Sequence, residues 1–239
     1  MRSKYRAVCI ALVAALAVTA LSAGSAFAAL PEFSPIYKTK ETFSGKAVGV
    51  TKWEISTGIA WEDTEATISG EIVLSGPHAR KALQNVTMKF VGGGTVGAAC
   101  RNKSNELVLT GLEAYLGYIN ESTKEIGLAF FEPWPEGGNW FFQALASCTV
   151  NPVGGKLEGV IVVPLTEAKT FSKTHSLAFT QEKGKMTYGT VKFKWEGGKL
   201  PWGGFGFPLH TQRGEENLFS DGIQASMPFV TEEPIEVIG

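Results

Sequence analysis

Alternation of apolar and polar residues with a period of two is the feature of this chain that most constrains its fold. In the segment ATISGEIVL (66–74), the even positions are apolar or glycine, whereas Thr67, Ser69 and Glu71 between them are polar. The segments VTMKF (86–90) and VKFKW (191–195) repeat the pattern. Successive side chains of a strand point to opposite faces, so each segment predicts a strand with one dry and one wet face. Such strands are typical of antiparallel sheets, and no long amphipathic helical pattern competes with them.

Turn residues divide the chain into roughly eleven to thirteen short strands. The clearest hairpin is LGYINESTKEIGL (116–128), in which two strands flank the polar turn 120–124. A flat sheet of so many strands would leave long open edges and an uncovered apolar face. The expected fold class is therefore all-β, as a single-domain antiparallel β-sandwich or flattened β-barrel, and we favour the sandwich.

The first 28 residues have the pattern of an export signal. Three basic residues (Arg2, Lys4 and Arg6) precede an apolar run over 7–21, and Ala26-Phe27-Ala28 supplies a small-residue cleavage site. We expect cleavage after Ala28 rather than retention as an uncleaved anchor. The mature chain, 29–239, is then expected to be secreted or envelope-associated, as one β-rich domain with an extended N-terminal arm over 29–40. No segment of the mature chain approaches the roughly 20 apolar residues of a transmembrane helix.

Charge argues against nucleic acid as a partner. Without the three basic residues of the leader, the chain has 19 basic and 23 acidic residues, a formal charge of −4. The lysines are scattered among glutamates, whereas a protein that binds phosphate backbones is expected to show a basic patch or stripe.

Two cysteines, Cys100 and Cys148, remain in the mature chain. Disulfides persist in exported proteins, so we expect these two residues to be paired. Closing a loop of this size would stabilise the fold by about 4 kcal/mol in the chain-entropy treatment. A reactive thiol or a metal site is the alternative, but neither cysteine has a second cysteine or a histidine at ligand spacing.

The sequence contains no pattern that assigns a catalytic residue, a metal or a cofactor. Glu62, Asp63 and Glu65 cluster beside Trp61, and paired carboxylates could support glycoside hydrolysis or hold calcium. A solvated loop explains the cluster equally well, and we favour that interpretation. None of the three histidines lies in a nucleophile context, and His175 shares strand phase with apolar residues, which predicts a partly buried structural side chain.

Two segments rich in tryptophan, proline and paired glycine are the candidate binding elements: FFEPWPEGGNWFF (130–142) and WEGGKLPWGGFGFPL (195–209). Trp134, Trp140 and Trp202 could form a stacking surface for sugar rings or an apolar ligand. Alternatively, these side chains fold back and close the core, which the alternation at Trp140 supports. Trp134 and Trp202 are the pair that we expect to be most exposed, because proline and glycine flank them.

Several segments carry a resemblance to a known family: ALPEFSP (29–35), ETFSGKAVGV (41–50), ISGEI (68–72), LEAYLGYINESTKEIGL (112–128) and LAFTQEKGK (177–185). Together they resemble a family of secreted β-rich proteins of soil actinobacteria that has no assigned activity. The similarity covers most of the mature chain, but its motifs are strand alternation and turn residues. It therefore implies a fold and export, and no site residues.

These observations favour a noncatalytic secreted β-domain, with a binding role or a structural role at the cell envelope. A glycan or cell-wall component is the partner that the aromatic segments suggest. A barrel that carries an apolar ligand and a carbohydrate-active hydrolase that uses the clustered carboxylates are the two alternatives.

Overall fold

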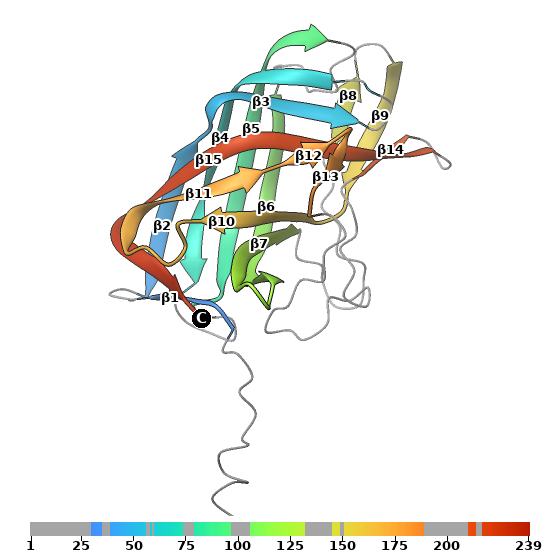
Figure 1. Ribbon diagram of the computed structural model, residues 1–239. Coiled ribbons are helices and arrows are strands. Elements are labelled where there is room, and N and C mark those ends of the chain that lie inside the picture. The colour runs from blue at the N-terminus through green and yellow to red at the C-terminus, as the bar shows by residue number, and fades with distance from the viewer. Residues whose placement is uncertain are drawn as a thin grey trace, which may run out of the picture.

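The structure is a computed structural model of the 239-residue chain. It describes residues 30–34, 39–55, 58, 60–73, 79–96, 106–131, 145–148, 151–188, 210–213 and 217–239. Every regular element in these stretches is a β-strand (Figure 1). The all-β fold class predicted from the alternation is therefore confirmed.

Fifteen strands lie in the described stretches. In chain order they are β1 (Glu32–Ser34), β2 (Lys40–Lys46), β3 (Val48–Ile55), β4 (Ala60–Val73), β5 (Ala82–Val96), β6 (Glu106–Asn120), β7 (Glu125–Phe131), β8 (Leu145–Cys148), β9 (Asn151–Glu158), β10 (Ile161–Thr166), β11 (Ser172–Phe179), β12 (Gln181–Glu182), β13 (Lys185–Met186), β14 (His210–Arg213) and β15 (Asn217–Ile238). One sheet contains 13 of them, and β12 and β13 form a separate hairpin. Strands β4, β5, β6 and β15 have 14, 15, 15 and 22 residues, so they are longer than the short strands expected from the turn signals.

The main sheet closes into an antiparallel barrel with eight strand positions. Hydrogen-bonded neighbours follow the order β4, β5, β6, β7, β10, β11 and β15, and β15 returns to β4 through β2 and β3, which share the eighth position. Neighbours in the ring also follow one another along the chain, apart from excursions through β8–β9 and β12–β14. Of the two expected alternatives the structure thus shows the barrel, in which closure removes the free edges of the sheet.

Strand β15 is longer than the barrel and carries the sheet beyond it. Its first residues pair with β14, which pairs with β9, and β9 pairs with β8. These strands form an extension on one side of the barrel in Figure 1. Near the same end of the barrel the hairpin β12–β13 packs against β15, where Ile223 donates its N–H to Met186 Sδ at 3.2 Å. Met186 is buried in the core, so this hairpin covers part of the barrel end.

Large side chains fill the interior of the barrel. One buried apolar cluster draws residues from every strand position, and its largest fully buried members are Trp53, Tyr118, Phe33, Phe90, Phe130, Phe179 and Phe229. The predicted dry faces point into it: Ala66, Ile68 and Ile72 on β4, and Val86, Met88 and Phe90 on β5, are all buried. The segment 191–195 lies outside the described residues. The predicted hairpin is also confirmed, because β6 ends at Asn120 and β7 begins at Glu125.

Bulges change which residues of a strand face the interior. On β6 the inward residues are Leu107 and Leu109 and then Leu112, so the phase switches at Gly111. The register with β5 shifts at the same place, and Gly111 has a φ of 69°. That left-handed conformation is the one that glycine adopts at a bulge without steric cost. The long strands therefore keep an apolar interior face although their sequences do not alternate strictly throughout.

One end of the barrel is covered by β1 and the last residues of β15, which lie together at the bottom of Figure 1. Phe33 pairs with Val237, and both side chains are 1% exposed within the core cluster. Arg80 holds β1 in place: its carbonyl oxygen accepts the N–H of Phe33 at 2.7 Å, and its Nε donates to the carbonyl oxygen of Phe33 at 3.1 Å. Part of the expected N-terminal arm thus forms a strand that closes the barrel.

A second apolar cluster lies on the outside of the barrel. Strands β5, β6, β7 and β10 and the residue before β10 supply its buried members, which are Ala82, Tyr115, Ile119, Ala129, Phe131, Val160 and Val162. Tyr115 and Phe131 stack with a centroid distance of 5.3 Å and an interplanar angle of 4°. This side of the barrel is buried on both faces, which explains why β7 has no polar side chain after Glu125.

No helix among the described residues is long and apolar enough to span a bilayer.

Candidate functional site

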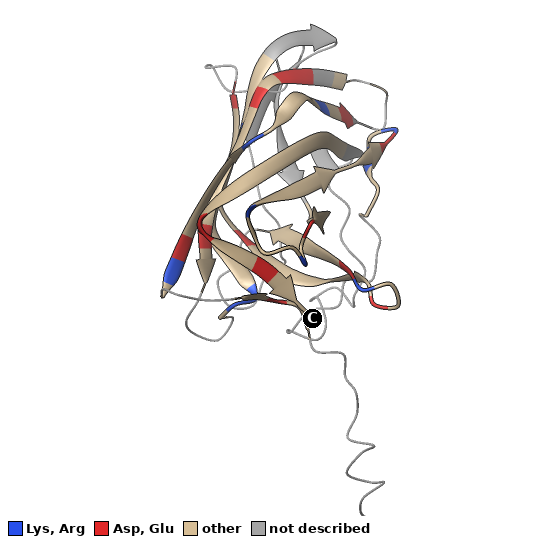
Figure 2. Cartoon of the chain, turned by 60° about the vertical axis from the view of Figure 1, so that its left-hand side comes forward, with Lys and Arg blue, Asp and Glu red and all other residues tan. Residues whose placement is uncertain are grey.

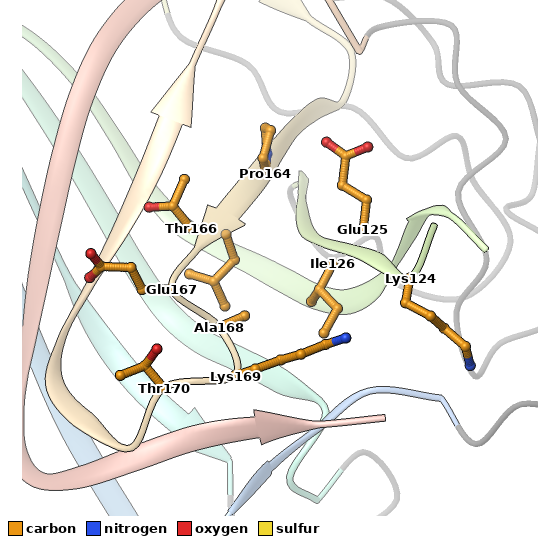
Figure 3. Close-up of a pocket in the computed structure, with 10 residues that line it drawn as sticks. Lys124, Glu125, Ile126, Pro164, Thr166, Glu167, Ala168, Lys169 and Thr170 are labelled. Atoms are coloured by element: carbon orange, nitrogen blue, oxygen red, sulfur yellow. The ribbon is translucent and has the colours of Figure 1, made fainter. Parts of the chain in front are cut away.

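A pocket of about 370 Å³ lies at the end of the barrel that β1 covers. It is formed by the end of the β6–β7 turn, the start of β7, the end of β10 and the β10–β11 connection (Figure 3). The residues that line it are Lys124, Glu125, Ile126, Pro164, Leu165, Thr166, Glu167, Ala168, Lys169 and Thr170. Its volume is within the range of roughly 300–1,000 Å³ that is typical of small-molecule sites.

The two turns that form the pocket have defined local conformations. Asn120 Oδ1 accepts hydrogen bonds from the backbone N–H groups of Ser122 and Thr123 at 3.1 and 3.3 Å, which is the arrangement of an Asx turn. Thr170 N–H donates to the carbonyl oxygen of Glu167 at 2.9 Å in the other turn. Lys124 and Glu167 both have left-handed backbones, with φ of 57° and 59°. Each turn therefore holds a charged residue in a backbone conformation that few residues other than glycine adopt.

The inner part of the pocket is apolar and belongs to the barrel core. Ile126, Leu165 and Ala168 are buried, and all three are members of the interior cluster. Val237 N–H donates to the carbonyl oxygen of Ala168 at 2.6 Å. The C-terminal part of β15, which closes the barrel, thus also supports the base of the pocket.

Charged and hydroxyl groups surround this apolar base. Lys124 Nζ lies 4.9 Å from the centroid of the Tyr118 ring, a cation–π contact. Glu125 Oε1 accepts a hydrogen bond from Tyr188 Oη at 3.2 Å. In Figure 3 Lys169 is directed toward the Lys124 side of the pocket, whereas Glu167 points the opposite way. An apolar base with a mixed polar rim is suited to a ligand that has both a ring or alkyl face and polar substituents.

Tyr188 remains a hydrogen-bond donor to the pocket wall. Burial, and then the neighbouring carboxylate of Glu125, raise the pKa of Tyr188 above its usual value of 10.0. A phenol that is harder to ionise stays protonated over the physiological range. The carboxylate of Glu125 is therefore held by a neutral hydrogen-bond donor.

His175 lies beneath the β10–β11 connection and is 1% exposed, as its strand phase predicted. Its Nε2 is 3.1 Å from the carbonyl oxygens of both Ser172 and Ile235. Because both partners are acceptors, we assign the proton to Nε2, which leaves Nδ1 as a buried atom with no hydrogen-bond partner. Burial lowers the pKa of His175, although the two carbonyl groups and Glu167 oppose this effect.

Acidification is expected to destabilise the fold through His175. In the unfolded state His175 takes up a proton near pH 6.5, whereas in the folded state it does so only at a lower pH. The stability that neutral His175 contributes is therefore fully present above pH 6.5, and it is lost as the pH falls from 6.5 toward the lower pKa of the folded state. Each unit of pKa difference corresponds to about 1.4 kcal/mol. Urea unfolding of the wild type and of His175→Gln at pH 7.5 and pH 5 tests this. The wild type should lose more stability than the variant between the two pH values, and an equal loss would contradict the assignment.

The clustered carboxylates do not form a common site. Glu62, Asp63 and Glu65 lie on β4, so the solvated loop that we favoured is wrong. Asp63 is 0% exposed and pairs in register with Thr51 of β3, whereas Glu62 and Glu65 are exposed. Glu65 instead forms an ion pair with Lys46 at 3.4 Å. Among the described residues there is also no group of three histidine, cysteine, aspartate or glutamate side chains that could hold a metal ion.

Several predicted site residues lie outside the described part of the chain. Trp134, Trp140, Trp202 and Cys100 belong to this group, and Cys148 ends β8, where only the backbone is described. The stacking surface and the disulfide therefore stay predictions. The first two aromatic residues of the segment 130–142 are described: Phe130 is buried in the barrel interior and Phe131 in the outer cluster.

Sequence reasoning did not identify the pocket. The residues that line it are of common types and come mainly from the β6–β7 and β10–β11 turns, which lie far apart in the chain. No sequence motif connects the two turns. The only signal was the polar turn 120–124, which was interpreted as a turn and nothing more. Comparison of the chain with protein-family models, with curated proteins and with solved structures gave no match.

Proposed function

We propose that this chain is an exported, noncatalytic β-barrel domain that acts by binding, outside the cell or at its envelope, and that the pocket at the closed barrel end is part of its binding surface. The observation that carries the proposal is the contrast between a barrel interior occupied by large apolar side chains and an accessible pocket with polar walls. The family resemblance in the mature chain supports export.

The filled interior weighs against a carrier of an apolar ligand. Eight-stranded barrels that carry ligands leave a central cavity, whereas here Trp53 and Phe90 meet edge-to-face at 5.1 Å and Phe43 and Phe229 at 5.2 Å in the interior. Such contacts are those of a packed core. A ligand is then expected to bind on the outside of the barrel.

The separation of the acidic residues weighs against a hydrolase. Two catalytic carboxyl groups must face one substrate, yet Asp63 points into the barrel while Glu62 and Glu65 are exposed. A glycan or cell-wall component is the partner that we favour. The pocket supports this choice because sugars combine apolar ring faces with hydroxyl groups, and its base and walls offer a partner for each.

Replacing Thr170 with tryptophan is expected to lower binding to cell-wall polysaccharide about tenfold or more, because an indole at the exposed edge of the pocket would occupy it. The measurement is cosedimentation of the secreted protein with insoluble wall material. Thr174→Trp is the matched control, since Thr174 is exposed on β11 and does not line the pocket. If both variants bind like the wild type, the pocket is not the binding surface.

A further inference from the structure

The two lysines of the pocket lack the carboxylate partners that several other basic residues of the described chain have. Five basic residues form ion pairs with glutamates: Lys40 with Glu71, Lys46 with Glu65, Lys52 with Glu54, Arg80 with Glu32, and Lys89 with Glu106. Figure 2 shows the same interspersion, with blue and red segments close together on the strands. Within the described residues Lys124 and Lys169 form no ion pair. Their positive charge is thus available at the pocket.

The two carboxylates of the pocket do not neutralise these lysines directly. Glu125 accepts the hydroxyl of Tyr188. Glu167 points away from Lys169 in Figure 3 and acts instead on His175, whose charged form it favours. Both ammonium groups therefore lie toward the Lys124 side of the pocket, where the carboxylate of Glu125 is engaged by Tyr188.

The geometry points to a specific class of ligand: we propose that the pocket binds an acidic sugar, with its carboxylate held by Lys124 and Lys169. This inference rests on the proposed function and names the ligand of the same pocket. The sugar ring lies against Ile126 and Ala168, and hydroxyl groups of the sugar bond to the side chains at the rim. Lysine is suited to this task because its ammonium group is a mobile point charge with three donors.

Charge balance selects a carboxylate over a phosphate. The lining residues include two lysines and two glutamates, so the pocket has no formal net charge. A monoanionic carboxylate is attracted by the two lysines and is moderately repelled by Glu125 and Glu167. A dianion would double the attraction and the repulsion alike, whereas its cost of dehydration rises with the square of its charge, so a pocket without net charge compensates a dianion less well. A phosphorylated sugar is accordingly expected to bind more weakly than a uronic acid of the same size.

The test compares trigalacturonate with its fully methyl-esterified form, which has the same sugar rings and no charge. Binding to the secreted protein is followed by isothermal titration calorimetry and by amide chemical shifts at millimolar ligand. We expect the acid to bind about tenfold more tightly than the ester, with shifts confined to the two turns, and its affinity to fall as salt is added. The double variant Lys124→Met, Lys169→Met should abolish this preference.

Lys46→Met is the matched control, because Lys46 is an exposed lysine that pairs with Glu65 and does not line the pocket. It should leave the preference unchanged. Galactose 6-phosphate, compared with galacturonate, tests the choice between phosphate and carboxylate, and tighter binding of the phosphate would overturn that choice.

The failures of the two proposals are distinguishable. If the ester binds at the pocket as tightly as the acid, or if the double variant keeps the preference, the acidic-sugar inference is wrong and the binding role stands. If trigalacturonate shifts no pocket resonance, the inference is also wrong. If in addition Thr170→Trp leaves binding to cell-wall material unchanged, the proposed binding role of the pocket is contradicted as well.

Discussion

Replacing Phe33 with alanine is expected to lower the free energy of unfolding by about 3–5 kcal/mol. Phe33 is one of the largest fully buried side chains, and β1 has only three residues with which to hold it at the barrel end. Truncation would leave a cavity against Val237 and weaken the pairing of β1 with β15. Urea denaturation followed by tryptophan fluorescence measures the loss.

Phe171→Ala is the matched control for this substitution. Phe171 is 52% exposed in the β10–β11 connection, so the same change of side chain should alter stability by no more than about 0.5 kcal/mol. A loss below about 1 kcal/mol for Phe33→Ala would mean that β1 does not close the barrel.

Phe33→Ala is also expected to affect the pocket. Phe33 packs on the C-terminal part of β15, and Val237 there donates a hydrogen bond to the carbonyl oxygen of Ala168 at the pocket base. Loosening β1 is therefore expected to loosen the β10–β11 connection as well. Hydrogen exchange should become faster at Val237 and Thr170 in the variant, before any global unfolding.

The elements of the barrel could be predicted from the sequence where the signal is local. Ile68, Met88 and Phe90 point into the core as their period of two requires, and the turn after Asn120 is fixed by a short polar segment between two apolar strands. These features depend on neighbours in sequence, because the pleat of a strand and the preferences of turn residues act over a few residues.

Closure of the barrel could not be predicted in the same way. It depends on pairing β11 with β15, where His175 lies opposite Phe229, and these residues are far apart in the chain. A sandwich and a barrel place the same side chains on the same dry face, so alternation does not distinguish them. Whether a barrel or a sandwich forms is decided by the pairing register between strands that are distant in the sequence.

Asp63 shows how a β-bulge makes strand phase predict the wrong face for a residue. The even positions of β4 after Ala66 point inward, so an odd position such as 63 would be assigned to the outside. The register with β5 shifts between Asp63 and Glu65, which brings Asp63 into the inward phase. No residue from Asp63 to Glu65 is a glycine, so little in the sequence of β4 indicates the bulge.

The candidate site was missed for a different reason. Sequence reasoning followed composition to Trp134 and Trp202, because tryptophan is rare and offers a large contact area. The pocket instead uses residues such as Lys124, Ala168 and Lys169, which are unremarkable individually and become a site only when the barrel brings two turns together. Its lysines can be recognised as available only once the partners of the other basic residues are known.

Replacing Gly45 with alanine is expected to be more damaging than its single methyl group suggests. Gly45 of β2 lies opposite Phe229 of β15, and a Cβ atom there would overlap the carbonyl oxygen of Pro228 and come within 2.9 Å of Phe229 Cα. These are backbone atoms in a paired strand, so the clash can be relieved only by separating β2 from β15. The expected loss of stability is at or above the upper end of the ~1–3 kcal/mol that is typical of overpacking.

Gly111→Ala separates this clash from the general cost of replacing a glycine. A Cβ at Gly111 meets no atom within 4 Å, so only its left-handed backbone opposes the change, at about 1–2 kcal/mol. Hydrogen exchange then locates the damage. In Gly45→Ala the amides of β2 and of the facing part of β15 should lose protection while the β5–β6 pair keeps it, because only the seam that β2 completes is opened. Equal losses of stability in the two variants would contradict this expectation, because Gly45, unlike Gly111, does not have a left-handed backbone that could account for the cost.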